Sequence, residues 1–132
     1  MRTVIVFTVL FAMNGCQKAI EEETEIMKLR VISDYGRTER LVADEATPEI
    51  VVSTMHSLDW RGFHQVVLER SNSDWMEVGG SLDPSDGLSV MYEENGKQSV
   101  IRVAPTTVED MTTMLLGYLS GTEDWKKSAK WD

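Results

Sequence analysis

Asn95-Gly96 lies between two runs, residues 88–94 and 97–104, in which apolar and polar side chains alternate. An Asn-Gly pair in this setting favours a type I′ turn, because both central residues of that turn need a positive φ. It is the strongest short-range signal for a β-hairpin, and it places the two runs side by side as antiparallel strands. This feature therefore commits the C-terminal half of the chain to an antiparallel sheet.

Two more strands precede this hairpin along the chain. Residues 63–70 and 75–80 are predicted as strands, because both have period-two patterning and a four-residue polar turn joins them. The turn composition of residues 83–87 (DPSDG) then leads into residues 88–94. Within residues 63–70 the odd-numbered positions share one face and the even-numbered positions share the other. The four runs are expected to form a meander.

The segment before residue 63 begins with strands and continues into a helix. Residues 28–32 are rich in β-branched side chains and predict a first strand, and residues 37–42 predict a second, short one. Thr47-Pro48 then indicates a helix start, with Thr47 as N-cap and Pro48 at the first helical position. This helix is expected to end near Asp59.

A second helix follows the meander. Thr106 and Glu109 fit a capping box, and Thr107 with Asp110 fits it less closely. Gly121 is expected to end this helix. The whole pattern predicts an α+β fold with a mostly antiparallel sheet of about four to six strands and two helices packed on one face. Residues 27–132 are expected to form this single domain.

The first sixteen residues have a different character. Arg2 precedes an apolar run over residues 4–13, and Gly15 precedes Cys16, the single cysteine of the chain. The run is much shorter than the roughly 20 residues of a membrane-spanning helix. The order of these features resembles a bacterial lipoprotein signal, although Met13 and Asn14 depart from the usual residues before the cysteine.

That resemblance implies a division of the N-terminal region. Residues 1–15 would be a signal peptide, Cys16 would carry the lipid, and residues 16–26 would be an acidic tether. Gln17 stands where an Asp would retain an enteric lipoprotein in the inner membrane, so the resemblance implies an outer-membrane anchor facing the periplasm. The alternative is translation from Met27, which would give a cytoplasmic protein and make the leader a start-site artefact.

Charge and cysteine content exclude several classes of protein. The chain has 13 basic and 22 acidic side chains, a net charge of −9, and residues 27–132 alone carry a net charge of −7. Proteins that bind the phosphate backbone need a basic face, so direct nucleic-acid binding is not expected. One cysteine excludes both an intramolecular disulfide framework and a cysteine-rich zinc site.

No motif in the sequence predicts catalysis. His56 and His64 are the two imidazoles, and Asp59 lies between them, but their spacing matches no metal-binding motif. No phosphate-binding glycine loop and no GxSxG nucleophile turn is present. We therefore expect a protein that is not an enzyme and that uses no metal or cofactor.

Acidic turns and tryptophans are the candidate contacts for a protein partner. Aromatic side chains are enriched at interface hot spots, although in a small domain they also fill the core. Acidic side chains would steer the protein toward a basic surface. The candidate partner-binding residues are Asp83, Asp86, Glu93, Glu94, Trp125 and Trp131.

The region from Thr47 to the C-terminus resembles the small immunity proteins of bacterial polymorphic toxin systems. The shared features are an early helix, a meander with acidic turns, and a closing helix that leads to Trp125 and Trp131. The resemblance implies a protein that blocks a toxin by covering its active surface. The alternative is a small envelope lipoprotein with a structural or binding role unrelated to toxins.

Overall fold

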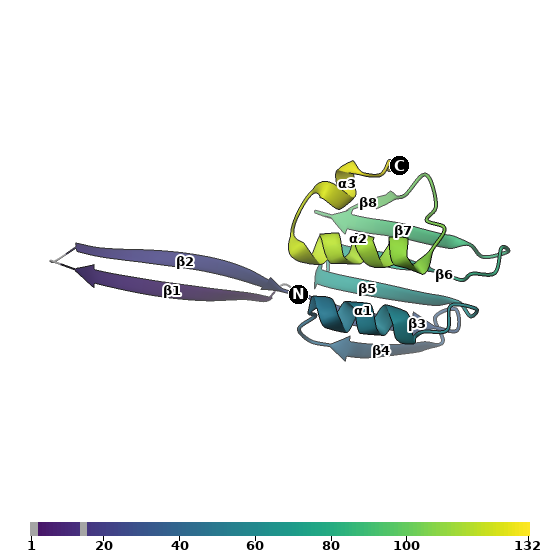
Figure 1. Cartoon of the computed structure of the whole chain (residues 1–132), viewed down its shortest axis with the longest axis horizontal. Coiled ribbons are helices and arrows are strands. Elements are labelled where there is room, and N and C mark those ends of the chain that lie inside the picture. The colour runs from purple at the N-terminus through teal and green to yellow at the C-terminus, as the bar shows by residue number, and fades with distance from the viewer. Residues whose placement is uncertain (1–2, 14–15) are drawn as a thin grey trace.

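The computed structural model describes residues 3–13 and 16–132 (Figure 1). Its strands are β1 (Thr3–Met13), β2 (Cys16–Ile26), β3 (Lys28–Ser33), β4 (Thr38–Ala43), β5 (His64–Ser71), β6 (Asp74–Gly80), β7 (Leu88–Glu94) and β8 (Lys97–Val100). Its helices are α1 (Pro48–Ser57), α2 (Val108–Ser120) and α3 (Asp124–Lys127).

Six of the strands form one antiparallel sheet in the order β4-β3-β5-β6-β7-β8. Helices α1 and α2 lie side by side across one face of this sheet (Figure 1). The α+β class, the number of strands and the two helices on one face are thus confirmed. The short helix α3 is an addition that the sequence patterns did not predict.

The core lies between the sheet and the two helices. In the sheet, the core side chains occupy alternate positions, as the period of a β-strand requires. The strands contribute Leu29, Val31, Val66, Leu68, Met76, Val78, Leu88, Val90 and Tyr92. The helices contribute Val51, Met55, Met111, Leu115 and Tyr118. The even-numbered face of the predicted 63–70 strand is therefore the core face.

The helix starts follow the capping rules, with one correction. The Thr47 side chain accepts a hydrogen bond from the Ile50 amide at 3.2 Å, and Pro48 is the first helical residue, as predicted. For α2 the N-cap is Thr107, whose hydroxyl accepts from the Asp110 amide at 3.1 Å. The prediction of Thr106 was wrong by one residue, because adjacent threonines offer the same capping oxygen.

The last strand is shorter than predicted, and the C-terminus pairs with its end, on the side away from β7. Strand β8 ends at Val100, and Val100 and Asp132 exchange two backbone hydrogen bonds. The Arg102 amide also donates to the Lys130 carbonyl at 2.9 Å. The Ile101 amide still donates to the Val90 carbonyl of β7 at 2.9 Å, and Ile101 forms an isolated bridge with Trp131, so the chain end pairs with residues 100–102.

Strands β1 and β2 form a separate two-stranded hairpin, in register from Thr3 opposite Ile26 to Met13 opposite Cys16. Figure 1 shows this hairpin extending away from the six-stranded sheet. The sequence predicted a signal segment and a tether here, whereas residues 3–13 are β-branched enough to adopt a strand. Arg2, Asn14 and Gly15, on which the resemblance to a lipoprotein signal partly rests, lie outside the described residues.

Candidate functional site: the open face of the sheet

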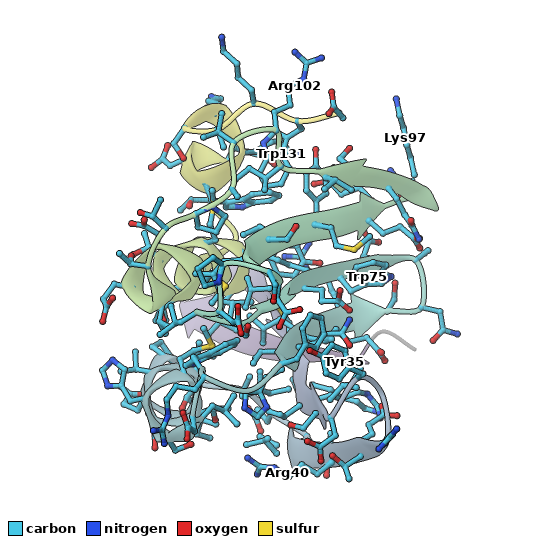
Figure 2. The ribbon with its side chains drawn as sticks, turned by 90° about the vertical axis from the view of Figure 1, so that its right-hand side faces the viewer. Tyr35, Arg40, Trp75, Lys97, Arg102 and Trp131 are labelled. Atoms are coloured by element: carbon cyan, nitrogen blue, oxygen red, sulfur yellow. The ribbon has the colours of Figure 1, made fainter. Side chains whose placement is uncertain are left out.

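The sheet face opposite α1 and α2 is covered by none of the helices in residues 16–132, and we call it the open face (Figure 1). Figure 2 views the sheet from one end, with the helices to the left and Trp75 on the other side. The strand registers place on this face Lys28, Arg30, Ile32, Glu39, Leu41, Gln65, Val67, Glu69, Trp75, Glu77, Gly79, Ser89, Met91, Glu93, Gln98 and Val100.

Val67 lies at the centre of the open face. Its partners in register are Arg30 on β3 and Glu77 on β6, and Glu77 is followed by Met91 on β7. These side chains reduce the exposure of Val67 to 8%, while most of the face around it is only half-buried. Arg30 also lies 3.7 Å from Glu69, so a salt bridge crosses the centre of the face. The face therefore combines an apolar centre with charged side chains.

The open face contains a cavity of about 130 Å³ beside Glu77, which we call the Glu77 cavity. It lies over Gly79, which has no side chain and separates Gln65 on β5 from Ser89 on β7. Phe63 and Met91 provide its apolar walls. Gly79 contributes bare backbone to the lining, and a Cβ there would already lie 3.1 Å from Gln65 Cγ.

Glu77 is half-buried at the edge of this cavity. Its Oε2 accepts a hydrogen bond from Gln65 Nε2 at 3.2 Å. Burial raises the pKa of Glu77, and the Gln65 hydrogen bond only partly opposes this shift. Within the described residues, this carboxylate forms no ion pair with a Lys or Arg side chain.

Three loops meet at the other wall of the cavity. The Tyr35 ring stacks on Phe63 with a centroid distance of 4.6 Å, and its hydroxyl donates to Asp86 Oδ2 at 3.2 Å. Ser81 donates to the same oxygen at 2.7 Å. The hydrogen bond to Asp86 raises the pKa of Tyr35, and the charges of Asp86 and Asp83 add to that shift. Asp86 is thus a carboxylate held at the cavity by two neutral hydroxyl donors.

Gly80 fixes the approach of β6 to β7 beneath this site. It has a φ of +116°, and a Cβ there would lie 1.9 Å from the Gly87 carbonyl oxygen. Only glycine fits this close approach of two backbones. The position of the loop that carries Asp86 therefore depends on Gly80.

The four predicted acidic contacts do not form one patch. Asp83 and Asp86 precede β7, while Glu93 and Glu94 end it, so the two pairs are about 20 Å apart at 3.4 Å per residue. Asp83 accepts from the Ser85 amide and hydroxyl, and these bonds lower its pKa. Of the four, Asp86 lines the Glu77 cavity and Glu93 belongs to the open face.

The two predicted tryptophans lie in a cluster that attaches the C-terminus to the domain. Trp125 is 7% exposed, and Trp131 and Tyr92 both pack edge-to-face against it. Trp131 Nε1 donates to the Lys126 carbonyl at 2.9 Å. Lys126 also forms a salt bridge of 2.7 Å with Glu94. These side chains are engaged within the domain, and Trp131 is labelled beside α3 in Figure 2.

A second and larger hollow lies on the helix side of the molecule. This groove of about 760 Å³ runs between α2, α3 and residues 101–105. Its apolar lining includes Ile101, Val103, Met114 and Trp125. Trp125 therefore lines a surface groove with the small part of its ring that stays exposed.

The histidines do not form a metal site with Asp59 in the described residues. His64 Nδ1 lies 2.7 Å from the Ser33 hydroxyl, and its Nε2 lies 2.8 Å from the Asp59 carbonyl oxygen. The Asp59 carboxylate instead pairs with Arg61 at 2.6 Å, and these hydrogen bonds lower its pKa to about 2. Residues 3–13 and 16–132 contain no group of three or more potential metal-ligating side chains.

Of the residues that line the Glu77 cavity, Asp86 was among the predicted site residues, whereas Glu77, Gln65, Phe63 and Met91 were not. The alternation in residues 63–70 and 75–80 did place Gln65 and Glu77 on faces that could be named in advance. The sequence could not say that Tyr35 and Asp86, 51 residues apart, would meet. That contact depends on β3 pairing with β5, which no local signal specifies.

Comparisons with protein-family models, with curated proteins and with solved structures found no match to the chain. No helix in the part of the chain that the structure describes is both long enough and apolar enough to cross a membrane.

Proposed function

We propose that this protein is a non-catalytic binding protein of the immunity type, which blocks a toxin by covering its active surface with the open face. The observation that carries the proposal is the uncovered side of the six-stranded sheet, where half-buried Ile32, Trp75 and Met91 stand among charged side chains. Inhibition by occlusion needs no catalytic group, only a complementary surface.

The size of the open face suits a protein partner. Six strands at a spacing of about 4.8 Å and a length of about 20 Å give a planar area of roughly 500 Å². A standard interface buries about 800 Å² on each partner. The open face would supply most of one side, and the loops beside β6 and β7 would supply the remainder.

The charge of the face selects a basic partner. The open face has four glutamates, Glu39, Glu69, Glu77 and Glu93, against the two basic residues Lys28 and Arg30. Toxins that act on nucleic acid carry basic sites, because they bind a phosphate backbone. An acidic face would steer the protein onto such a site, and association would slow as salt rises.

Co-expression tests this function directly. An immunity gene normally follows the gene of its toxin, so the product of the neighbouring gene is the candidate toxin. It is expressed in a host cell with and without the full chain, and growth is measured. We expect the neighbouring product to stop growth and the full chain to restore it. A neighbouring product that is harmless, or that remains toxic in the presence of the chain, would refute the immunity function.

A matched pair of charge reversals locates the surface. Glu93→Lys changes the open face, whereas Glu45→Lys makes the same change in net charge in the loop before α1. We expect Glu93→Lys to reduce protection and Glu45→Lys to preserve it. If both variants lost protection equally, protection would depend on the net charge of the protein and not on the open face.

We also propose that Cys16 carries a lipid that holds the protein in the cell envelope, in line with the order of Arg2, the apolar run and the single cysteine. Cleavage before Cys16 would remove β1 and leave β2 without its pairing partner, so residues 16–26 would act as the tether. The intact mass of the protein from its native host tests this. A lipid-bearing species that begins at Cys16 supports the anchor, and a species that begins at Met27 contradicts it.

A further inference from the structure

We propose that the Glu77 cavity receives the guanidinium group of an arginine side chain of the protein partner. The inference rests on the proposed function, because it names the chemical group by which the open face would recognise a basic protein. It adds a specific anchor to what would otherwise be a general attraction between opposite charges.

The electrostatics of the cavity favour a cation. Glu77 and Asp86 line it, and the side chains that donate hydrogen bonds to these two carboxylates, Gln65, Ser81 and Tyr35, are neutral. These donors orient the carboxylates without neutralising them. A cation that entered would meet the half-buried carboxylate of Glu77, where an ion pair is stronger than on an open surface, and the exposed carboxylate of Asp86 beside it.

The apolar walls favour a flat cation over a compact one. Phe63 presents an aromatic ring, held in place by the stack with Tyr35 at 4.6 Å, and Met91 lines the cavity as well. A guanidinium group is planar and weakly hydrated, stacks on aromatic rings and binds carboxylates through two parallel hydrogen bonds. An ammonium group is strongly hydrated and gains less from such walls.

The cavity has room for one side-chain end group. Its volume of about 130 Å³ is several times the roughly 30 Å³ share of one water molecule in the liquid. It is well below the roughly 300–1,000 Å³ of pockets that enclose a whole small ligand. A side chain delivered from a partner protein fits this size.

Burial of Glu77 also points to an incoming cation. The pKa of this carboxyl is raised because burial disfavours its charged form. A cation in the cavity would favour the charged form again. The folded protein therefore holds a carboxylate that would be stabilised when the partner is bound.

Titration of the full chain with n-butylguanidinium tests the proposal without any partner protein. Backbone amide NMR signals of Gly79, Gly80 and Ser89 report on the cavity, and n-butylammonium serves as the compact-cation control. We expect saturable shifts in the millimolar range at these residues and weaker binding of n-butylammonium. For Glu77→Gln we expect about tenfold weaker binding, which corresponds to about 1.4 kcal/mol.

Glu93→Gln is the matched control variant, because it removes an open-face carboxylate outside the cavity. It should bind n-butylguanidinium as the original chain does. The same spectra report whether each variant is folded. The proposal is overturned if the shifts do not saturate, if folded Glu77→Gln binds equally well, or if the ammonium ion binds as tightly as the guanidinium ion.

The guanidinium titration and the co-expression test can fail independently of each other. Saturable guanidinium binding with no rescue from the toxin would leave the cavity as a site and refute the immunity function. Rescue from the toxin by a chain whose cavity binds no guanidinium would support the immunity function and refute the arginine anchor.

Discussion

Replacement of valine by threonine at two adjacent positions of β5 measures the difference between the two faces of the sheet. Val66 lies in register between Val31 and Val78, with no exposed surface. Val67 lies between Arg30 and Glu77 on the open face and is 8% exposed. Threonine has the same shape as valine, so each substitution introduces a hydroxyl without opening a cavity.

The loss of folding free energy at each position depends on the side chains that surround the new hydroxyl. A hydroxyl at position 66 is surrounded by apolar side chains, and burying such a group without a hydrogen bond costs about 1–3 kcal/mol. A hydroxyl at position 67 lies beside a guanidinium and a carboxylate that can bond to it, so the cost is expected to stay below about 0.5 kcal/mol. For a domain of about 100 residues, 1 kcal/mol corresponds to a melting-temperature shift of about 4–8 °C.

Urea denaturation of the full chain and the two variants gives the free energies. We expect Val66→Thr to lower the denaturation midpoint clearly and Val67→Thr to leave it nearly unchanged, with equal m-values in all three proteins. Equal losses at the two positions would refute the assignment of one face to the core and the other to a surface with polar neighbours.

Three further variants test individual groups. Thr47→Ala removes the side chain that accepts from the Ile50 amide at 3.2 Å, and we expect thermal denaturation to show a loss of about 1 kcal/mol. Glu77→Gln removes a carboxyl whose raised pKa makes its contribution to stability decrease as pH rises. As the pH is raised from 4 to 7, the free energy of unfolding of this variant should therefore increase relative to that of the unsubstituted chain. An increase only as the pH is lowered would contradict the raised pKa. Tyr118→Phe removes a hydroxyl that is buried and has no hydrogen-bond partner within the described residues, where burial raises the pKa of Tyr118 to about 12. We expect this variant to be neutral or more stable in urea, and a loss above about 1 kcal/mol would indicate a hydrogen bond to that hydroxyl.

Local signals predicted those parts of the fold that depend on neighbouring residues. Asn95 and Gly96 have φ values of +51° and +79°, as a type I′ turn requires, and Glu94 pairs with Lys97 across it. Thr47 caps α1 as its sequence indicated. Each of these features is determined within a few residues, so one segment of sequence is enough to specify it.

Parts that depend on distant segments could not be predicted. The order β4-β3-β5 places β3 between its own hairpin partner and a strand from beyond α1. Nothing in residues 28–33 indicates two partners, because a central strand and an edge strand share the same alternation. The pairing of Val100 with Asp132 likewise joins segments that are distant in the sequence.

The candidate site was predicted only in part for the same reason. Turn acids are easily found in a sequence, but Asp83 and Glu94 are engaged by Ser85 and Lys126. Glu77 occupies an ordinary strand position, and only the pairing of β5, β6 and β7 around Gly79 makes a cavity beside it. A carboxylate in the middle of a strand carries no local sequence signal that marks it as part of a site.

Oxidative footprinting of the complex with the neighbouring gene product shows whether the partner covers the open face of the sheet. Trp75 and Met91 are half-buried on the open face, and Trp131 and Met114 are half-buried on the helix side. Hydroxyl-radical labelling read by mass spectrometry compares each pair with and without the partner. The account predicts that the partner protects Trp75 and Met91 and leaves Trp131 and Met114 unchanged. Protection of Trp131 and Met114 alone would contradict it and would place the partner on the helix side.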